Sequence, residues 1–149
     1  MLNLSTNMKN KKNSFFKNDK KFKEIKKGQK FTYKKKITAN AIQKFASMIG
    51  DKNPLHFKTK KSNHKVVAHG MLIGSFVSTL LGSFFPIKNN VLVSMNLNFK
   101  FPVYPGDEIK IIASITNKSE INNIIILKID IYNYKKLSVF GEAIVKVNL

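Results

Sequence analysis

The sequence HGMLIGSFVSTLLGS, residues 69–83, decides the fold. It is apolar on nearly every helical face, with glycine and serine placed among bulky side chains. A helix that is apolar all round belongs in the interior of a protein. The run falls well short of the roughly 20 residues that a membrane-spanning helix needs, so no membrane span is expected. The sequence therefore predicts one long helix buried by the rest of the domain.

The chain after this helix changes to a two-residue periodicity that is typical of strands. Four long segments rich in β-branched and aromatic residues are predicted strands: 91–100, 108–117, 121–133 and 137–148. Turn signals separate the strands at residues 105–107, 117–119 and 134–136. Because short connections join antiparallel neighbours, these strands are expected to form an antiparallel sheet.

The chain before the buried helix supplies one more strand and one more helix. Residues 31–37 alternate as a strand does, and Thr38 is a plausible N-cap for a helix that ends at Gly50. The order of strand, helix, loop, helix and four strands indicates an α+β fold, with an antiparallel sheet against the buried helix.

The composition of the 149 residues limits the possible functions. The formal net charge is +19, yet all 27 basic residues are lysine, whereas sequence-specific readers of nucleic acid rely on arginine. No specific nucleic-acid partner is therefore expected, and the charge is attributed mainly to genome composition. With no cysteine, the chain has no disulfide or thiolate metal site, which is consistent with a cytoplasmic location.

The lysines are concentrated near the beginning of the chain. Of the 27 lysines, 13 lie within residues 1–36, in runs with asparagine that cannot bury enough apolar area to fold. Residues 1–27 are therefore predicted to be a disordered or loosely ordered tail, and residues 28–149 the folded domain. No signal peptide is visible in the tail, and import into an organelle stays open as an alternative.

Asp51 and His56 are candidates for acid–base chemistry. They lie in the loop after the first helix, which Pro54 stiffens by fixing one φ and restricting Asn53. A carboxylate and an imidazole that share a water can accept and deliver protons between them. Taken alone, the same residues are also common in an ordinary helix-exit turn.

The start of the buried helix is a second candidate site. Backbone N–H groups are unpaired there, and Gly70 lets a ligand oxygen approach them closely, as the stabilisation of an oxyanion requires. A packing role for Gly70 is the alternative. His69 is expected to be a hydrogen-bonding structural residue, and His64 a solvated surface residue.

Four blocks of the sequence together resemble the (R)-specific enoyl-CoA hydratases of the MaoC-like dehydratase family. The blocks are GDKNPLH at 50–56, AHGML at 68–72, NFKFPVYPGD at 98–107 and GEAIV at 141–145. They come in matching order and at near-matching spacing over about residues 28–149. The resemblance implies a hot-dog fold, in which a long central helix is wrapped by an antiparallel sheet, as a homodimer or a dimer of dimers.

The resemblance also implies an activity, the reversible hydration of trans-2-enoyl-CoA to (R)-3-hydroxyacyl-CoA. It assigns Asp51 and His56 to water activation and supply of the α-carbon proton, and the Gly70 N–H to the thioester oxygen. The residues that it places in loop support or in the substrate pocket are Asn53, His69, Met71 and Ser78. It implies no metal and no cofactor, with coenzyme A present only as part of the substrate.

Several alternatives stay open from the sequence. A 3-hydroxyacyl-acyl-carrier-protein dehydratase would run the same chemistry on a different carrier, so the partner is an acyl-CoA or an acyl-carrier-protein thioester. A non-catalytic acyl-CoA-binding module, a basic nucleic-acid-binding protein and a thioesterase on the same fold are further alternatives. The acyl chain length, the oligomer size and the physiological direction are not fixed by the sequence.

Overall fold

The computed structural model describes residues 22–58 and 63–147. The predicted helices and strands are all present, each within a few residues of its expected bounds. In chain order the elements are η1 Phe22–Glu24, β1 Lys30–Lys36, α2 Ala39–Ile49, η2 Pro54–His56, α3 Gly70–Ser83, β2 Asn90–Phe99, β3 Glu108–Ser119, β4 Ile124–Asn133 and β5 Lys136–Val147.

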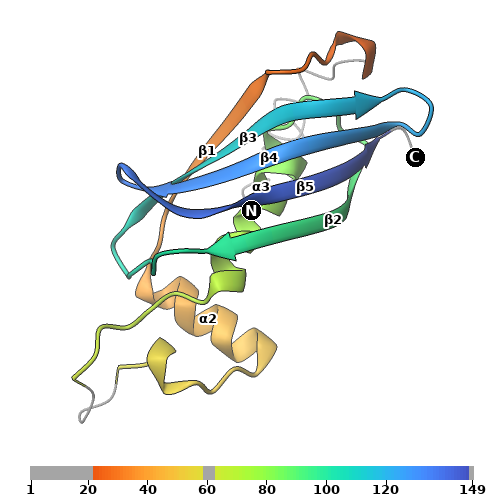
Figure 1. The fold of residues 1–149 in the computed structure, drawn as a ribbon. Coiled ribbons are helices and arrows are strands. Elements are labelled where there is room, and N and C mark those ends of the chain that lie inside the picture. Colours follow the sequence, from red (N-terminus) through yellow and green to blue (C-terminus); the bar gives the residue numbers. More distant parts are fainter. Residues whose placement is uncertain (1–21, 59–62, 148–149) are drawn as a thin grey trace, which may run out of the picture.

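The five strands form one antiparallel sheet in the order β1-β3-β4-β5-β2. Helix α3 lies along one face of this sheet, which curves around it (Figure 1). Inward-facing isoleucines, leucines and valines of β3, β4 and β5 are fully buried against the helix. This arrangement confirms the α+β hot-dog fold. None of the helices in the described part of the chain is long and apolar enough to cross a membrane.

Helix α3 is buried on one side rather than all round. Leu72, Ile73, Val77, Leu80 and Leu81 are buried. The opposite stripe of the helix is exposed, because the sheet covers only one side. The residues of this stripe recur every three or four positions; they are Met71, Ser75, Ser78 and Gly82. The predicted burial of the helix is confirmed on the side that faces the sheet, and the opposite stripe is exposed in the single chain.

The predicted ends of α2 are confirmed in detail. The Thr38 side chain accepts a hydrogen bond from the Ala41 N–H at 3.1 Å, and Gly50 ends the helix in the left-handed conformation at φ 74°. The turn expected at residues 117–119 is wrong, because β3 continues to Ser119 past an irregularity in register between Ile115 and Asn117. The chain reverses at residues 120–123 instead, where Asn123 has the positive φ that a tight turn needs.

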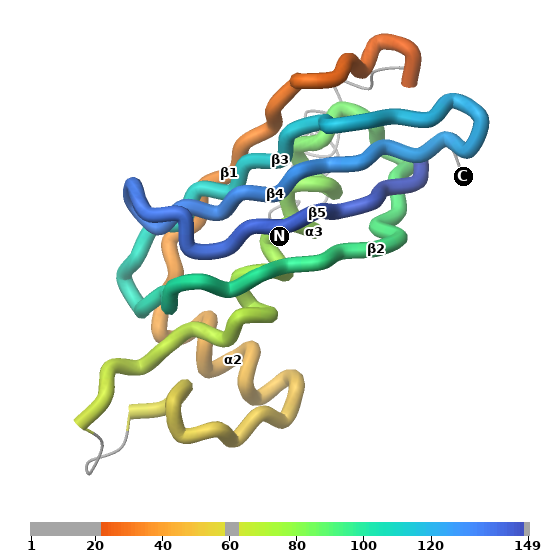
Figure 2. Tube along the Cα trace, in the orientation of Figure 1, coloured from red at the N-terminus to blue at the C-terminus, as the bar shows by residue number. Residues whose placement is uncertain are grey.

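Helix α2, η2 and the loop after them extend beyond the end of the sheet at which α3 begins (Figure 2). The chain leaves this lobe at Ala68, whose N–H donates to the carbonyl of Val103, in the connection between β2 and β3, at 2.8 Å. The lobe therefore places the loop after α2 directly beside the first turn of α3.

The packed domain begins earlier than residue 28, the predicted boundary. Phe22 and Ile25 are buried in the core, and the Gly28 N–H donates to the Ile115 carbonyl at 2.8 Å. Lys118 Nζ lies 5.0 Å from the centre of the Phe22 ring. Two apolar side chains among the lysines are enough to fix this segment to the domain. Residues 1–21 of the predicted tail lie outside the described residues.

Replacing Ile25 by alanine is expected to lower the free energy of unfolding by about 2–5 kcal/mol, as is usual when a large aliphatic side chain is removed from a core. Ile25 is 0% exposed, so the substitution leaves a cavity. Chemical denaturation measures the change. Lys23→Ala, at an exposed position of the same 3-10 turn, is the matched control and should stay within about 0.5 kcal/mol of the parent. Equal stability of the two variants would show that the segment does not contribute to the core.

Candidate active site

The loop after α2 holds the Asp51 carboxylate in a fixed orientation. Asp51 Oδ1 accepts a hydrogen bond from the Asn53 N–H at 2.8 Å, and Asn53 Oδ1 accepts one from the Leu55 N–H at 3.1 Å. Pro54 then begins η2. Short polar side chains that bond to the backbone two residues ahead stabilise turns of this kind. One carboxylate oxygen, Oδ2, is left to face the rest of the site.

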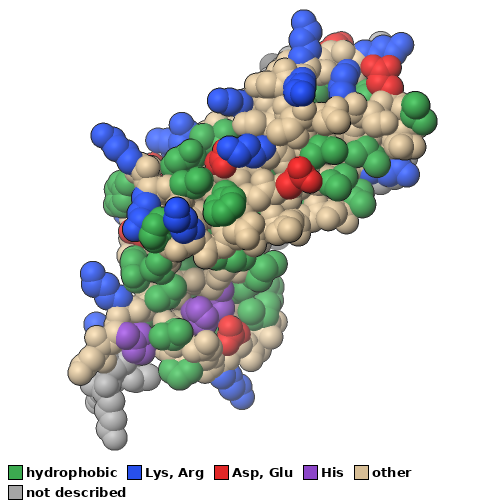
Figure 3. Space-filling view, in the orientation of Figure 1, with side chains coloured by type: hydrophobic (Ala, Val, Ile, Leu, Met, Phe, Trp, Pro, Cys, Tyr) green, Lys and Arg blue, Asp and Glu red, His purple; other side chains and the backbone are tan. Residues whose placement is uncertain are grey.

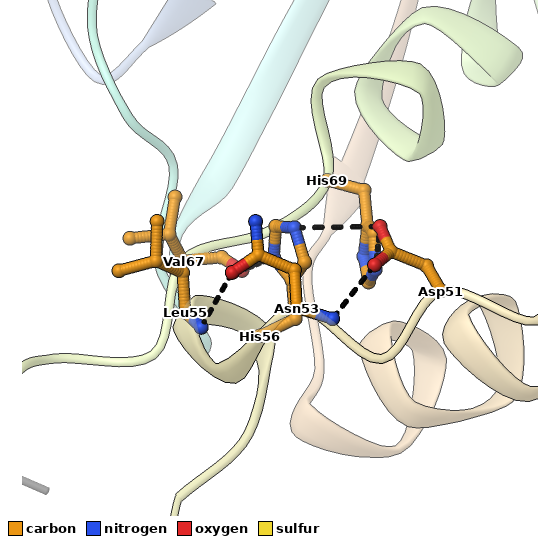
Figure 4. A network of polar contacts seen from close by, with 6 residues as sticks. All are labelled: Asp51, Asn53, Leu55, His56, Val67 and His69. Atoms are coloured by element: carbon orange, nitrogen blue, oxygen red, sulfur yellow. Dashed lines mark hydrogen bonds and ion pairs between the residues drawn. The ribbon is translucent and has the colours of Figure 1, made fainter.

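His56 presents a nitrogen lone pair toward that carboxylate. Its Nδ1 lies 2.7 Å from the Val67 carbonyl oxygen, which can only accept, so Nδ1 carries a hydrogen. In the neutral ring Nε2 is then the unprotonated nitrogen, and it lies 3.8 Å from Asp51 Oδ2 (Figure 4). The backbone thus fixes the tautomer that a general base requires.

The segment that carries Val67 is bonded to the loop at two further points. The Val67 N–H donates to the Leu55 carbonyl at 3.0 Å, and His64 Nε2 lies 3.1 Å from the Pro54 carbonyl oxygen. His64 is therefore partly buried and bonded to the loop that carries His56, which corrects its expected role as a solvated surface residue.

His69 completes a group of three side chains. Its ring is 4% exposed and stacks on the His56 ring, with centroids 3.5 Å apart and planes inclined by 23°. Its Nε2 lies 3.5 Å from Asp51 Oδ2, and neither ring nitrogen has a hydrogen-bond partner among the described residues. Burial lowers the pKa of His69, with a further contribution from His56 that Asp51 partly opposes. Burial thus favours the uncharged form of the His69 ring, which lies beside the pair.

The three side chains offer ligand atoms within 4.8 Å of one another, as a metal site would. An imidazole lone pair lies in the plane of its ring, however, and the two rings are stacked nearly parallel. Their lone pairs lie in two separate, nearly parallel planes, so an ion in the plane of one ring lies out of the plane of the other. The arrangement suits proton transfer better than metal coordination.

A cavity of about 320 Å³, here called the site cavity, lies beside His56 and the start of α3. Gly70 lines it as the first residue of α3, where an N–H has no acceptor within the helix. A Cβ at Gly70 would lie 3.1 Å from the Phe99 ring, so glycine allows this ring to pack closely against the first turn of α3. The geometry provides a hydrogen-bond donor and the positive end of a helix dipole next to a base.

The remaining predicted pocket residues lie elsewhere. Met71 is 59% exposed and Ser78 is also exposed, both on the α3 stripe that faces away from the sheet, and neither lines the site cavity. Sequence reasoning missed several residues that do line it: Val67, Phe99, Phe101, Pro102 and Val139. Phe99, Phe101 and Pro102 belong to the NFKFPVYPGD block, which contributed to the family resemblance although none of its residues was given a role in the site.

Comparison with known proteins agrees with this geometry. A family model described as "MaoC like domain" matches residues 20–131. An (R)-specific enoyl-CoA hydratase of Aeromonas caviae is 35% identical over 125 residues, covering 80% of this chain and 93% of the relative. A mitochondrial 3-hydroxyacyl-[acyl-carrier-protein] dehydratase of Arabidopsis thaliana is 32% identical over 115 residues, covering 72% of this chain and 68% of the relative. The solved (R)-hydratase of A. caviae superimposes with a TM-score of 0.76 at 33% identity, over 83% of this chain and 98% of that one.

Proposed function

The chain belongs to the MaoC-like dehydratase family, and we propose that it catalyses the reversible hydration of trans-2-enoyl-CoA to (R)-3-hydroxyacyl-CoA. The observation that carries the proposal is the His56 Nε2 lone pair, fixed by the Val67 carbonyl, facing Asp51 beside a cavity that begins at Gly70. A base, a carboxylate and an oxyanion donor are the groups that addition of water to an enoyl thioester needs.

In the proposed mechanism a water molecule lies between Asp51 Oδ2 and His56 Nε2. Asp51 accepts one hydrogen bond from the water, and His56 removes the other proton as the water oxygen attacks the β-carbon. The electron pair of the C=C bond moves to the thioester oxygen, where the Gly70 N–H stabilises the enolate. The His56 imidazolium then returns its proton to the α-carbon. Water is the only co-reactant, and no redox step occurs.

The geometry also favours one stereochemical course. In this mechanism His56 both removes the proton of the attacking water and protonates the α-carbon, so both new bonds form on the same face of the substrate, which is syn addition. Hydration of enoyl-CoA substrates of increasing chain length, followed by chiral analysis of the product, tests the proposal. An (R) product supports it. An (S) product, or binding of enoyl-CoA without any turnover, contradicts it.

A carrier-protein substrate is the alternative that the relatives support. The Arabidopsis relative is named as a 3-hydroxyacyl-[acyl-carrier-protein] dehydratase. The chemistry at the reacting carbons is the same for both carriers, so the residues of the pair do not distinguish them. Comparing kcat/KM for matched CoA and carrier-protein thioesters decides between the two. Since that relative is mitochondrial by name, a cytoplasmic location of this chain stays a prediction.

The active form is proposed to be a homodimer that pairs through β2. This strand lies at one edge of the sheet and contains no charged residue, whereas the opposite edge strand, β1, ends in three lysines. Charges on an edge oppose strand pairing. Val91 and Val93 of β2 are 47% and 58% exposed, and a partner would cover them. The exposed α3 stripe, which includes Met71 and Ser78, is a further candidate for this interface.

Val93→Lys is expected to convert the dimer to a monomer, because pairing would bury an unpartnered ammonium group. The expected rise in the dimer dissociation constant is about 100-fold or more. Size-exclusion chromatography with light scattering over a concentration series measures it. Ile121→Lys, at a 94% exposed position in the β3–β4 connection, is the matched control and should leave the dimer intact. A dimer unaffected by both variants would mean that β2 is not the interface.

A further inference from the structure

His69 is a buried titratable residue that the proposed mechanism does not use. It is the N-cap residue of α3, yet its side chain makes no capping hydrogen bond within the described part of the chain. It is not among the residues that line the site cavity either. Both of its ring nitrogens are buried, and neither has a hydrogen-bond partner in residues 22–58 and 63–147. An apolar ring would avoid the free-energy cost of such burial, so packing alone accounts poorly for a histidine at this position.

The His69 ring lies between the His56 ring and helix α2. One face stacks on His56, and the Phe45 ring of α2 lies 5.2 Å away at an interplanar angle of 61°. Phe45 in turn packs against the hydrophobic core. Figure 3 shows histidine side chains gathered on the lobe around α2, beside an acidic side chain. Because stacked faces separate when a ring turns, this stack and the hydrogen bond to the Val67 carbonyl together fix the orientation of the His56 ring.

The second contact of His69 is with the carboxylate of the pair. Its Nε2 lies 3.5 Å from Asp51 Oδ2, and His56 Nε2 lies 3.8 Å from the same oxygen (Figure 4). A carboxylate only accepts hydrogen bonds, so the His69 tautomer with its hydrogen on Nε2 is favoured over one that places a lone pair beside a negative oxygen. In His56 the hydrogen is on Nδ1. The two stacked rings therefore have opposite tautomers, and His69 presents a donor where His56 presents an acceptor.

The groups around His69 favour its uncharged form. Burial lowers its pKa most, the proximity of His56 adds to this, and Asp51 partly opposes the shift. These two side chains are the titratable groups that face the ring among the described residues, since Phe45 on the α2 side is uncharged. Two stacked imidazolium rings would repel each other strongly. An uncharged His69 leaves the positive charge to form on His56, and it leaves the Asp51 charge free to stabilise that cation.

We infer that His69 is a positioning residue for the hydration reaction, whose ring holds the orientation of His56 and whose Nε2–H holds Asp51 Oδ2. The inference rests on the proposed function and adds to it a residue that does not touch the substrate. Both members of the pair are then fixed before the substrate binds. Fixing them in advance removes part of the entropy cost of reaching the transition state.

The first test is His69→Phe, which keeps a flat ring against His56 but removes the N–H that faces Asp51. We expect kcat for crotonyl-CoA to fall by about 10-fold, the effect of losing one polar contact to a charged group. KM should stay within about twofold of the parent, because His69 does not line the site cavity. The midpoint of chemical denaturation should be unchanged or higher. An unpartnered buried ring is replaced by an apolar one, and the Asp51 side chain, which is 33% exposed, can bind water instead.

His69→Gln is the complementary variant, because it keeps an N–H donor for Asp51 but removes the ring. It should also lower kcat, and it should lower stability as well, since the stack is lost. Met48→Phe, at a 75% exposed position of α2, is the matched control and should keep the parent kcat and KM. A His69→Phe variant that is less stable but has an unchanged kcat would make His69 a structural residue. A loss of 10²-fold or more, the range of a general base, would make it a catalytic one. Either result would overturn the inference.

The tautomers can be measured without any substrate. The chain contains three histidines, so the nitrogen-15 spectrum of its imidazole rings is simple, and His64→Gln identifies the signals of the third ring. At neutral pH we expect hydrogen on Nε2 of His69 and on Nδ1 of His56. Hydrogen on Nδ1 of His69, or a positive charge on His69 beside a neutral His56, would overturn the inference.

This measurement separates the inference from the proposed function. The expected tautomers in a protein that hydrates no enoyl thioester would contradict the proposed function, and the positioning role in hydration would fall with it. The opposite tautomer of His69 in an active hydratase would contradict the inference alone and leave the proposed function standing. The expected tautomers together with the 10-fold loss of kcat in His69→Phe would support both.

Discussion

His56→Ala is expected to lower kcat for the hydration of crotonyl-CoA by about 10²–10⁴-fold, the range that a positioned general base contributes. The substitution removes the Nε2 lone pair that faces Asp51, while the Val67 carbonyl that fixed it loses its partner. Asp51→Asn should cause a loss of the same order, because the amide keeps the shape of the side chain but removes the charge that stabilises the His56 imidazolium. Steady-state kinetics with a fixed chain length measure both.

Lys52→Ala is the control for this pair of variants. Lys52 is exposed and lies in the same loop, between Asp51 and Asn53, so a general disturbance of the loop would lower its activity too. We expect its kcat to stay within about twofold of the parent, as for other exposed positions away from structural features. If either Asp51→Asn or His56→Ala hydrated crotonyl-CoA at nearly the parent rate in a folded protein, the assigned roles would be wrong.

Gly141→Ala is expected to lower the free energy of unfolding by about 3 kcal/mol, at the upper end of what overpacking usually costs. A Cβ built at Gly141 would lie 1.8 Å from the Asn96 carbonyl oxygen and 3.0 Å from the Leu97 Cα. Both atoms belong to the backbone of β2, which pairs with β5 at this point, so the clash cannot be relieved by turning a side chain. The β2 strand must move, and thermal or chemical denaturation records the loss.

The control for this substitution is Gly82→Ala. Among the described residues of the single chain, nothing lies within 4 Å of a Cβ at Gly82, which belongs to the last turns of α3, so the added methyl group meets no neighbour within the chain. Because alanine is the better helix former, we expect unchanged stability or a gain of up to about 1 kcal/mol. A Gly141→Ala variant as stable as Gly82→Ala would mean that the β2–β5 pairing is looser than the structure shows.

The sequence allowed the fold to be predicted because its signals are local. The periodicity of β2 to β5, the Thr38 cap and the left-handed Gly50 each depend on a few neighbouring residues. The end of β3 was wrong because an irregular register lets the strand continue through residues that also favour a turn. Ile25 is buried in a segment that the Gly28 N–H joins to Ile115 of β3, far along the chain, which no local pattern contains.

The candidate site was predictable only in part for the same reason. Asp51 and His56 share one loop and could be paired from their spacing. The stacking of His69 on His56 arises only when the first turn of α3 meets that loop. The roles of His64 and Val67 were missed because each hydrogen bond joins a histidine ring to a backbone carbonyl, which residue type does not identify.

The location of Asp51 and His56 outside the strand ladder has a consequence for how such a protein can diversify. The sheet and α3 supply the stability, while the loop and the segment that carries Val67 supply the chemistry. Insertions or deletions between His56 and Ala68 are expected to leave the strand registers unchanged, since the described residues of that interval, 57–58 and 63–67, form no strand. Natural variation in the length of that interval can therefore change substrate preference with little effect on folding. The stability of the sheet and helix and the specificity of the site can then be selected separately.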